Sequence, residues 1–175
     1  MRIDYQEALT DEQRLADIWG MLCTYDHEFV PRLSARANTF QSELSRDDLV
    51  KQEPVRYYEN LKQQSFLLAF DEREQQVIGF MSFRPEYICE DLQDDVVTLY
   101  ITTIIVEKSH RGRGITTSFY REIALLADQR QLPITTRTWS TNHSHIHLLN
   151  KLGFQEVLRL RDGRGSGIDT VYFRK

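Results

Sequence analysis

A short basic stretch at residues 109–114, Ser-His-Arg-Gly-Arg-Gly, carries the clearest chemistry in this sequence. It follows a β-branched run and precedes apolar residues spaced as on one face of a helix. The first N–H groups of a helix lack intrahelical partners, and the helix dipole adds partial positive charge there. Arg111 and Arg113 add full charges, while Gly112 and Gly114 leave the backbone open to a bulky anion. We therefore predict that this turn binds phosphate.

Two other kinds of phosphate-binding loop do not fit this stretch. A dinucleotide-binding loop needs Gly-x-Gly-x-x-Gly, but position 117 is Thr. A P-loop needs Gly-Lys followed by Ser or Thr, which this turn lacks. A plain basic turn does not account for glycine at both 112 and 114, so anion binding is the interpretation that we keep.

Two motifs in the C-terminal half of the chain point to a known family. Residues 111–116, Arg-Gly-Arg-Gly-Ile-Thr, resemble the Gln/Arg-x-x-Gly-x-Gly/Ala pyrophosphate motif of the GNAT (GCN5-related) N-acetyltransferases. Asn142, followed at 145–154 by His-Ile-His-Leu-Leu-Asn-Lys-Leu-Gly-Phe, is similar to that family's Asn…Ala-x-x-hydrophobic-Tyr-x-x-x-Gly-Phe segment. Because the motifs occur in order and at the family's separation, the chain is identified as a member of this family.

The resemblance implies where acetyl-CoA, the family's co-substrate, binds. Its diphosphate would meet the turn, and its pantetheine arm would pair with the backbone at the end of the preceding strand. The residues implied for cofactor binding are Ile104, Ile105, Val106, Arg111, Gly112, Arg113, Gly114, Ile115, Thr116 and Asn142. Asn142 could equally serve only as the N-cap of the helix that follows it.

Two positions depart from the family pattern. Thr116 stands where the family usually has Gly or Ala, which crowds the start of the helix slightly. Leu149 replaces the tyrosine that many members use to protonate the departing thiolate. The fold does not depend on that tyrosine, but the usual general acid is missing.

Acetyl transfer to an amine also requires the amine to lose a proton, because a lysine-type amine has a pKa of about 10.4. The positions that match the family's base are Tyr100 and Thr102. Neither is a ready base, since the pKa of tyrosine is about 10. Tyr100 could instead order a water or position the amine. Ser144 is a candidate proton donor, and residues 26–28, Asp-His-Glu, are substrate-side candidates by rough topology.

Histidines and cysteines suggest no metal site. His143, His145 and His147 begin a predicted helix and do not share one face, and no Cys or carboxylate pattern completes a ligand set. We expect His145 at the surface, although its position in the family motif also allows a polar role at the site. Cys23 and Cys89 have no motif spacing and are predicted to be free, buried thiols.

The glycine-rich loop at 161–167, Arg-Asp-Gly-Arg-Gly-Ser-Gly, has the most unusual local composition. It fits a flexible hairpin turn. Alternatively, it closes over the acceptor site, where Arg161 or Arg164 would recognise a carboxylate or phosphate.

These features lie on one predicted domain, residues 1–175, of the mixed α/β class, with about seven strands and about four helices in a GNAT-like arrangement. Strands are expected at 2–8, 65–70, 77–83, 96–106, 134–139, 154–160 and 168–173. Helices are expected after an N-cap at Thr10 up to Pro31, in one or two short pieces within 32–53 (one starting at 45–48), up to residue 61, and at 115–130 and 143–152.

The strands at 65–70 and 77–83 should form an antiparallel hairpin, and residues 84–95 a polar connection. The strands at 96–106 and 134–139 flank the 115–130 helix as a parallel βαβ unit. The resemblance implies that these two strands splay apart and hold the thioester cofactor between them.

Composition limits the classes of partner. A net charge of −4 and a pI near 5.7 argue against nucleic acid, which needs a basic face. No apolar run approaches the ~20 residues of a membrane span, so no membrane partner is predicted. The acidic N-terminal stretch is unlike a signal peptide, which favours the cytoplasm. Monomer and homodimer are both compatible with the sequence.

Two hypotheses of function follow. The first is an N-acetyltransferase that moves the acetyl group of acetyl-CoA to a primary amine, on a small molecule or a peptide, by direct attack in a ternary complex. The second is a catalytically weak or inactive CoA-binding module of the same fold, with a sensing or scaffolding role.

Overall fold

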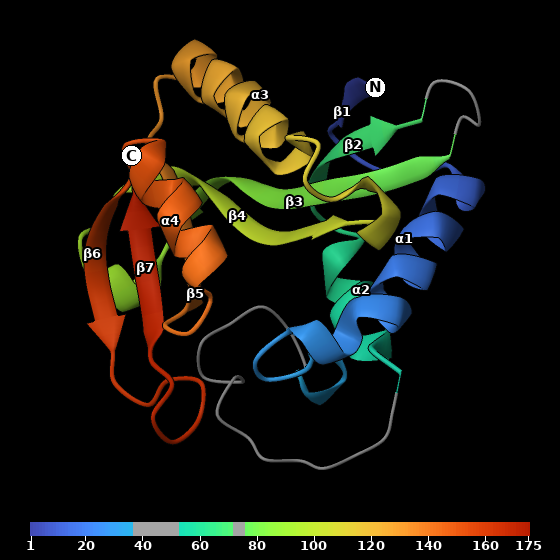
Figure 1. Cartoon of the computed structure of the whole chain (residues 1–175). Coiled ribbons are helices and arrows are strands. Elements are labelled where there is room, and N and C mark those ends of the chain that lie inside the picture. Colours follow the sequence, from blue (N-terminus) through green and yellow to red (C-terminus); the bar gives the residue numbers. More distant parts are fainter. Residues whose placement is uncertain (37–52, 72–75) are drawn as a thin grey trace.

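The computed structural model describes residues 1–36, 53–71 and 76–175, and it builds them around one seven-stranded mixed sheet (Figure 1). The strand order is β1-β2-β3-β4-β5-β7-β6. The strands are β1 (Arg2–Gln6), β2 (Ser65–Phe70), β3 (Val77–Ile88), β4 (Val97–Val106), β5 (Ile134–Trp139), β6 (Gln155–Leu160) and β7 (Thr170–Arg174). The described helices are α1 (Glu12–Tyr25), α2 (Val55–Leu61), α3 (Ile115–Arg130) and α4 (His143–Lys151), with short 3-10 turns between elements.

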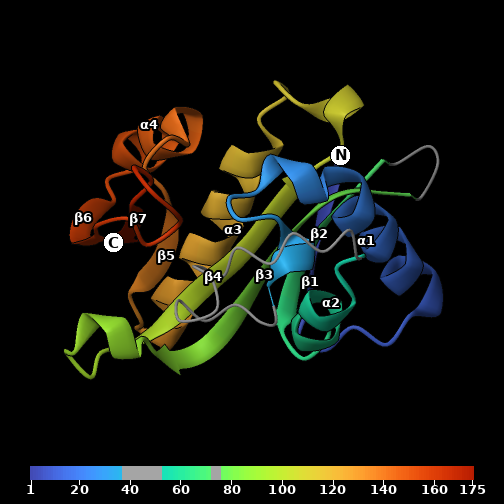
Figure 2. The same cartoon turned by 90° about the horizontal axis from the view of Figure 1, so that it is seen from below.

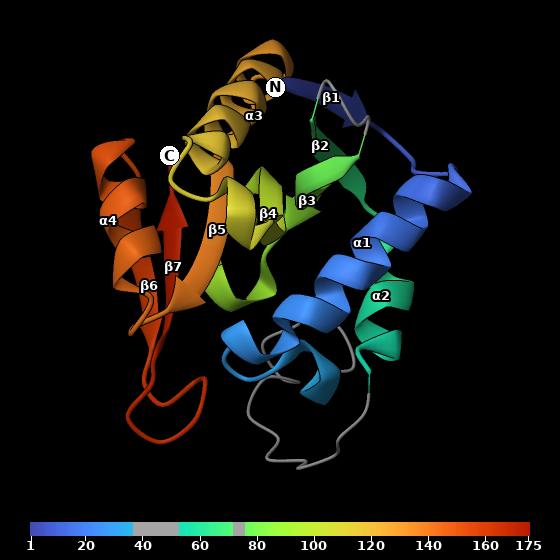
Figure 3. The same cartoon turned by 45° about the vertical axis from the view of Figure 1, so that its right-hand side comes forward.

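Each face of the sheet is covered by a different pair of helices (Figure 3). Phe119 and Ile123 of α3 and Leu149 of α4 pack on one face, against buried side chains of β2, β3 and β4. Ile18 and Leu22 of α1, with the buried side chains of α2, cover the other face. Alternation of side chains along β2 serves both layers, which explains why every residue of this strand is buried.

The sheet opens between its two parallel strands. The pairing of β4 with β5 extends only from Leu99↔Ile134 to Ile101↔Thr136, whereas both strands run on beyond it. Figure 2 shows the result from below, with β5, β7 and β6 on one side of the molecule and β1 to β4 on the other. The antiparallel hairpin of β2 and β3 and the parallel βαβ unit are confirmed, and so is the divergence that the resemblance implied.

A β-bulge lies on β4 at the point where the sheet opens. Ile101 pairs with Phe83 and Thr103 pairs with Ser82, so Thr102 is the extra residue. A bulge reverses the alternation of side chains along the strand that follows it. Ile105 therefore packs in the α1/α2 layer, although simple alternation from Ile101 would place it in the α3 layer.

Several predicted boundaries were wrong. The N-cap of α1 is Asp11, whose carboxylate accepts from the Arg14 N–H at 3.0 Å, and not Thr10. The α-helix ends at Tyr25 and continues only as a 3-10 turn. β1 ends at Gln6, two residues earlier than predicted.

The segment predicted as a polar connection after residue 83 is partly strand, because β3 continues to Ile88. Its outer half has a solvent-facing side, which explains the polar sequence, while Tyr87 packs on Tyr100 with ring centroids 5.0 Å apart. Cys89 is buried as predicted, but Cys23 is only half-buried. The helix start predicted at 45–48 lies outside the described residues.

Candidate active site

A cavity of about 600 Å³ lies where β4 and β5 diverge. It brings together residues from both predicted groups, the cofactor-binding and the catalytic. The predicted residues that line it are Tyr100, Thr102, Ile104, Ile105, Val106, Arg111, Gly112, Gly114, Ile115, Thr116, Asn142 and Ser144. Arg113 is exposed and does not line the cavity. The volume lies in the range typical of small-molecule sites.

The basic turn enters α3 with its backbone exposed to this cavity. Gly112 and Gly114 have φ of +75° and +79°, a region that L side chains rarely adopt. The first hydrogen bond of α3 runs from the Ser118 N–H to the Gly114 carbonyl at 2.9 Å. The N–H groups of Ile115, Thr116 and Thr117 therefore have no partner within the helix. This is the geometry of an anion site made by main-chain donors.

Arg111 already has a carboxylate partner. Its guanidinium donates to both oxygens of Glu28, at 2.8 and 3.0 Å, and its Nε donates to the Val106 carbonyl at 2.9 Å. It also stacks on Tyr25, 4.8 Å from the ring centroid. The side chain thus ties the 3-10 turn after α1 to the end of β4, and its charge is balanced locally.

Neither residue at the predicted base positions is free to accept a proton. Tyr100 is 4% exposed, and burial raises the pKa of its phenol above the ordinary value, so it remains protonated at neutral pH. The Thr102 hydroxyl is held by the Gln64 side-chain oxygen at 2.5 Å and by the Ser82 hydroxyl at 2.8 Å. Tyr100 can act as a hydrogen-bond donor, and Thr102 is anchored at the bulge.

The helix α4 contributes a histidine for which the sequence allowed two places, the surface and the site. His145 is half-buried and lines the cavity, and its Nε2 lies 2.7 Å from the Tyr120 hydroxyl, so the surface expectation was wrong. Burial lowers its pKa to about 4, so the ring is neutral at neutral pH. Leu149, one helical turn further on, is fully buried in the core below the cavity wall. The i, i+4 spacing of His145 and Leu149 was the signal that both point inward.

Asn142 stands at the N-cap position of α4, but its side chain makes no capping hydrogen bond. Its amide donates instead to the Thr138 hydroxyl at 3.1 Å, and the Ser144 hydroxyl donates to its oxygen at 3.4 Å. The capping interpretation was therefore wrong for the side chain, which lines the cavity. Ser144 is exposed at the rim of the same cavity.

The substrate-side candidates separate in the structure. Glu28 lines the cavity, whereas His27 is exposed and Asp26 is held by the backbone and hydroxyl of Ser34, at 2.6 and 2.9 Å. In the glycine-rich loop, Arg161 has a side chain that is 94% exposed, whereas Arg164 is buried and lines the cavity.

Sequence reasoning missed two further arginines of the cavity wall, Arg36 and Arg137. Arg36 lies in the polar segment 32–53, for which only short helices were predicted. Arg137 lies on the strand predicted at 134–139, whose sequence does not indicate a cavity. Within the described residues, no group of three or more His, Cys, Asp or Glu side chains is arranged to hold a metal ion. No described helix combines the length and apolar character needed to cross a bilayer.

Comparison with known proteins agrees with this geometry. The family model described as "Acetyltransferase (GNAT) family" matches residues 34–154. The structure of Arabidopsis thaliana NAA60 in complex with acetyl-CoA is similar, with a TM-score of 0.65 and 16% identity over 99% of this chain and 98% of that one. The NatC complex bound to Gag peptide and CoA contains a chain with a TM-score of 0.63 and 18% identity, covering 99% and 98%.

A third similar structure is that of ACIAD1637 from Acinetobacter baylyi ADP1, with a TM-score of 0.67 and 17% identity, over 99% of this chain and 92% of that one. No curated protein matches the chain in sequence. The chain belongs to the acetyltransferase (GNAT) family. Enzymes of this family take their acetyl group from acetyl-CoA.

Proposed function

We propose that this protein transfers the acetyl group of acetyl-CoA to a primary amine by direct attack in a ternary complex. The observation that carries the proposal is that one cavity joins the α3 turn, the gap between β4 and β5, and the polar residues around Tyr100. Both substrates can therefore meet without a covalent enzyme intermediate. In the reaction, the amine nitrogen bonds to the acetyl carbon as the C–S bond breaks. The amine loses a proton and the thiolate gains one.

The diphosphate of acetyl-CoA would bind at the N–H groups that open α3, and the pantetheine arm would lie along Ile104–Val106. Two observations support this placement. The glycines of the turn have positive φ and nothing within 4 Å of their Cβ positions. The outer half of β4 is not paired with β5, so its backbone groups on that side are available, apart from the Val106 carbonyl, which accepts from Arg111. A pantetheine arm carries amide groups that can pair with such an edge.

Rate acceleration would come chiefly from positioning. Bringing the amine and thioester together in one site can replace much of the entropic part of the barrier. The thiolate of CoA has a pKa close to that of cysteine, about 8.5, so it leaves without a strong acid. Tyr100 would orient the acceptor or a water through its hydroxyl. Thr102 would stay anchored at the bulge by its hydrogen bonds to Gln64 and Ser82. Ser144 would return a proton to the thiolate.

The alternative is a CoA-binding module with little or no chemistry. A specific observation favours considering it: the tyrosine position is occupied by Leu149, which is fully buried and offers no proton. The residue at position 100 is also a protonated phenol instead of a carboxylate.

Release of free thiol from acetyl-CoA, measured over a panel of amines and amine-bearing peptides, separates the two. Thiol release that depends on an amine, with the acetylated amine identified by mass, is the result expected of an acetyltransferase. Micromolar CoA binding with no amine-dependent thiol release would favour the binding module.

A further inference from the structure

Three arginines from distant parts of the sequence meet in the wall of the cavity. Arg36 follows the 3-10 turn Leu33–Ala35, Arg137 lies on β5, and Arg164 lies in the loop between β6 and β7. Arg36 and Arg164 are each only 6% exposed. Because arginine keeps its charge, burying several in one place is unfavourable unless an anion accompanies them.

The hydrogen-bond acceptors of the two buried arginines are neutral. Arg36 donates to the Pro31 carbonyl, from Nε at 3.0 Å and from Nη2 at 2.6 Å, and to the Val30 carbonyl at 3.1 Å. Arg164 donates to the same Val30 carbonyl at 2.8 Å and to the Thr170 hydroxyl at 3.1 Å. Two guanidinium groups therefore share one carbonyl oxygen, which brings two like charges together.

The surroundings do not neutralise these charges. Burial lowers the pKa of Arg36 to about 10, and burial together with repulsion from Arg36 and Arg137 lowers the pKa of Arg164 well below its usual value. Aromatic rings lie under both guanidinium groups, including that of Trp139 at 5.9 Å from Arg164. Such contacts give a modest attraction but carry no countercharge.

Two carboxylates act on this cluster without contacting Arg36 or Arg164. Asp26 accepts two hydrogen bonds from Ser34. Asp91 accepts one from the Tyr172 hydroxyl at 2.6 Å, and the same hydroxyl accepts from Arg137 at 3.1 Å, so Arg137 is linked to a carboxylate. In residues 1–36, 53–71 and 76–175, no carboxylate is within ion-pair distance of Arg36 or Arg164. Among the described residues, Arg36 and Arg164 therefore have no countercharge in contact with them.

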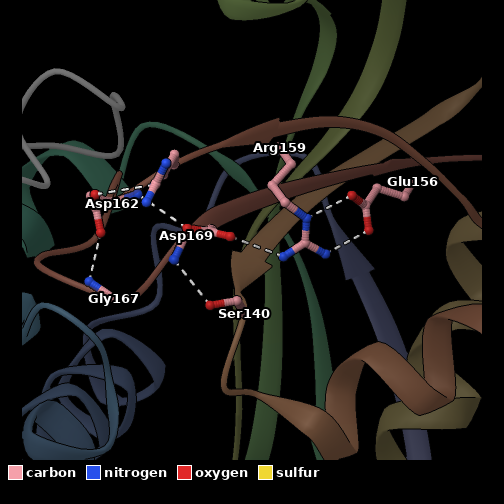
Figure 4. Close-up of polar contacts among 7 residues, drawn as sticks. Ser140, Glu156, Arg159, Asp162, Gly167 and Asp169 are labelled. Atoms are coloured by element: carbon pink, nitrogen blue, oxygen red, sulfur yellow. Dashed lines mark hydrogen bonds and ion pairs between the residues drawn. The ribbon is translucent and has the colours of Figure 1, made fainter.

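The loop that carries Arg164 is firmly held (Figure 4). The Asp162 carboxylate accepts from the Gly167 N–H at 2.6 Å, and the Asp162 N–H donates to Asp169 at 3.1 Å. Asp169 in turn accepts from Arg159 at 3.2 Å, and its own N–H donates to the Ser140 hydroxyl at 3.0 Å. Arg164 is therefore presented by a fixed scaffold, as expected for a group that recognises a ligand.

We propose that the acceptor is a small amine that also carries an oxyanion, a carboxylate or a phosphonate, and that this anion binds beside Arg36, Arg137 and Arg164. The proposal rests on the proposed function, because it assigns the acceptor of that same site. An oxyanion would supply the countercharge that Arg36 and Arg164 lack among the described residues, and the planar guanidinium groups suit its paired oxygens. The amine at the other end of the molecule would then face the thioester near Tyr100.

Matched pairs of amines test the proposal on the unaltered protein. At saturating acetyl-CoA, kcat/KM is measured for α-amino acids against their primary amides, and for aminoalkylphosphonates against the corresponding amino alcohols. We expect the anionic member of at least one pair to be favoured about 100-fold, mainly through KM, since hydrogen bonds between charged groups are the strong ones. The carboxylate and phosphonate arms show which oxyanion is preferred.

Equal or better kcat/KM for the neutral members, or for peptides without a nearby anion, would overturn the proposal and leave the acetyltransferase function intact. Absence of thiol release with every amine would overturn the proposed function, and this proposal with it.

Arg164→Gln is the variant that tests the cluster directly, with Arg161→Gln as its control. The control changes an arginine of the same loop whose side chain is 94% exposed and lies outside the cavity wall. Arg164→Gln should reduce the preference for the anionic amine about 10-fold or more, with Arg164→Lys intermediate and the Kd of acetyl-CoA unchanged. The control should keep the full preference.

A folded Arg164→Gln protein with an undiminished preference would contradict the proposal. Because Arg164 also holds the Val30 carbonyl, thermal unfolding is recorded for each variant. If Arg164→Gln does not fold, Arg137→Gln replaces it, and the same loss of preference is required.

Discussion

The two regions of the cavity that we propose to bind ligands are built in opposite ways. The turn at 109–114 is made of consecutive residues, and its donors are main-chain N–H groups fixed by two glycines with positive φ. The arginine wall is made of side chains from three segments, joined through the Val30 carbonyl. A site made by local backbone is visible in a sequence, whereas a site made by convergent side chains is visible only after folding. Under the two proposals above, the co-substrate would bind at the local site and the acceptor at the convergent one.

The largest expected effect follows from disturbing the backbone site. Gly114→Glu introduces a side chain at φ +79° and a negative charge beside the diphosphate position. We expect the Kd of CoA to rise about 100-fold, from the combined strain and repulsion. Calorimetric titration measures it. Gly20→Glu is the matched control, because Gly20 is exposed on α1, has no positive φ and lies outside the cavity wall.

An unchanged CoA affinity in Gly114→Glu would show that the diphosphate binds elsewhere. The comparison between the turn, where main-chain groups would bind, and the arginine wall, where side chains would bind, would then have no basis.

The next effect concerns His145, which lines the same cavity from α4. Its pKa is about 4 in the folded protein against 6.5 when unperturbed. Between these values the unfolded chain binds a proton at residue 145 that the folded protein does not, so acidification favours unfolding. Allowing for the partial exposure of the ring, the lowered pKa of His145 contributes about 2 kcal/mol to the free energy of unfolding. This contribution is fully present above pH 6.5 and is lost as the pH falls to about 4.

Urea unfolding at pH 7 and pH 4.5 checks this expectation. His145→Gln should lose less stability on acidification than the unaltered protein, by about 2 kcal/mol. His147→Gln, on the exposed side of the same helix, should follow the unaltered protein. Identical pH dependence in all three would mean that His145 is not protected from protonation.

The smallest expected effect concerns Arg111. It tests whether this side chain only holds the turn in place or also binds the phosphate itself. Glu28→Gln removes the carboxylate of its ion pair, whose two side chains are 36% and 41% exposed. Because pairs of such exposure contribute about 0–1 kcal/mol, stability should change little. If main-chain donors dominate binding, the Kd of CoA should change less than about 3-fold. Glu156→Gln, which breaks the similarly exposed pair with Arg159, is the control.

A tenfold gain in CoA affinity in Glu28→Gln, absent from the control, would instead mean that the released Arg111 is a major phosphate ligand.

Local patterns predicted the regular part of the fold well. The β-branched run of β4, the glycines and the apolar stripe of α3 are contiguous, so each could be recognised from its neighbours alone. The family motifs then indicated the parallel pairing and splay of β4 and β5, which the structure has. The motif residues also identified the part of the cavity wall formed by the start of α3 and the start of α4.

What the sequence did not predict depends on contacts between distant segments. The bulge at Thr102 arises from the register of β4 against β3, and the residue type at that position does not predict it. The burial of Arg36 and Arg164 depends on two loops that meet at Val30, 134 residues before Arg164. His145 looked like a surface residue because its partner, Tyr120, is on another helix.

The most direct test of the central claim is the backbone amide NMR spectrum of the protein, assigned and titrated with CoA. The account predicts the largest shifts for the amides of Gly112 to Thr117, where main-chain donors would bind the diphosphate, and further shifts along Ile104–Val106. Amides of that turn that stay unmoved at saturating CoA, with the largest shifts elsewhere, would contradict it.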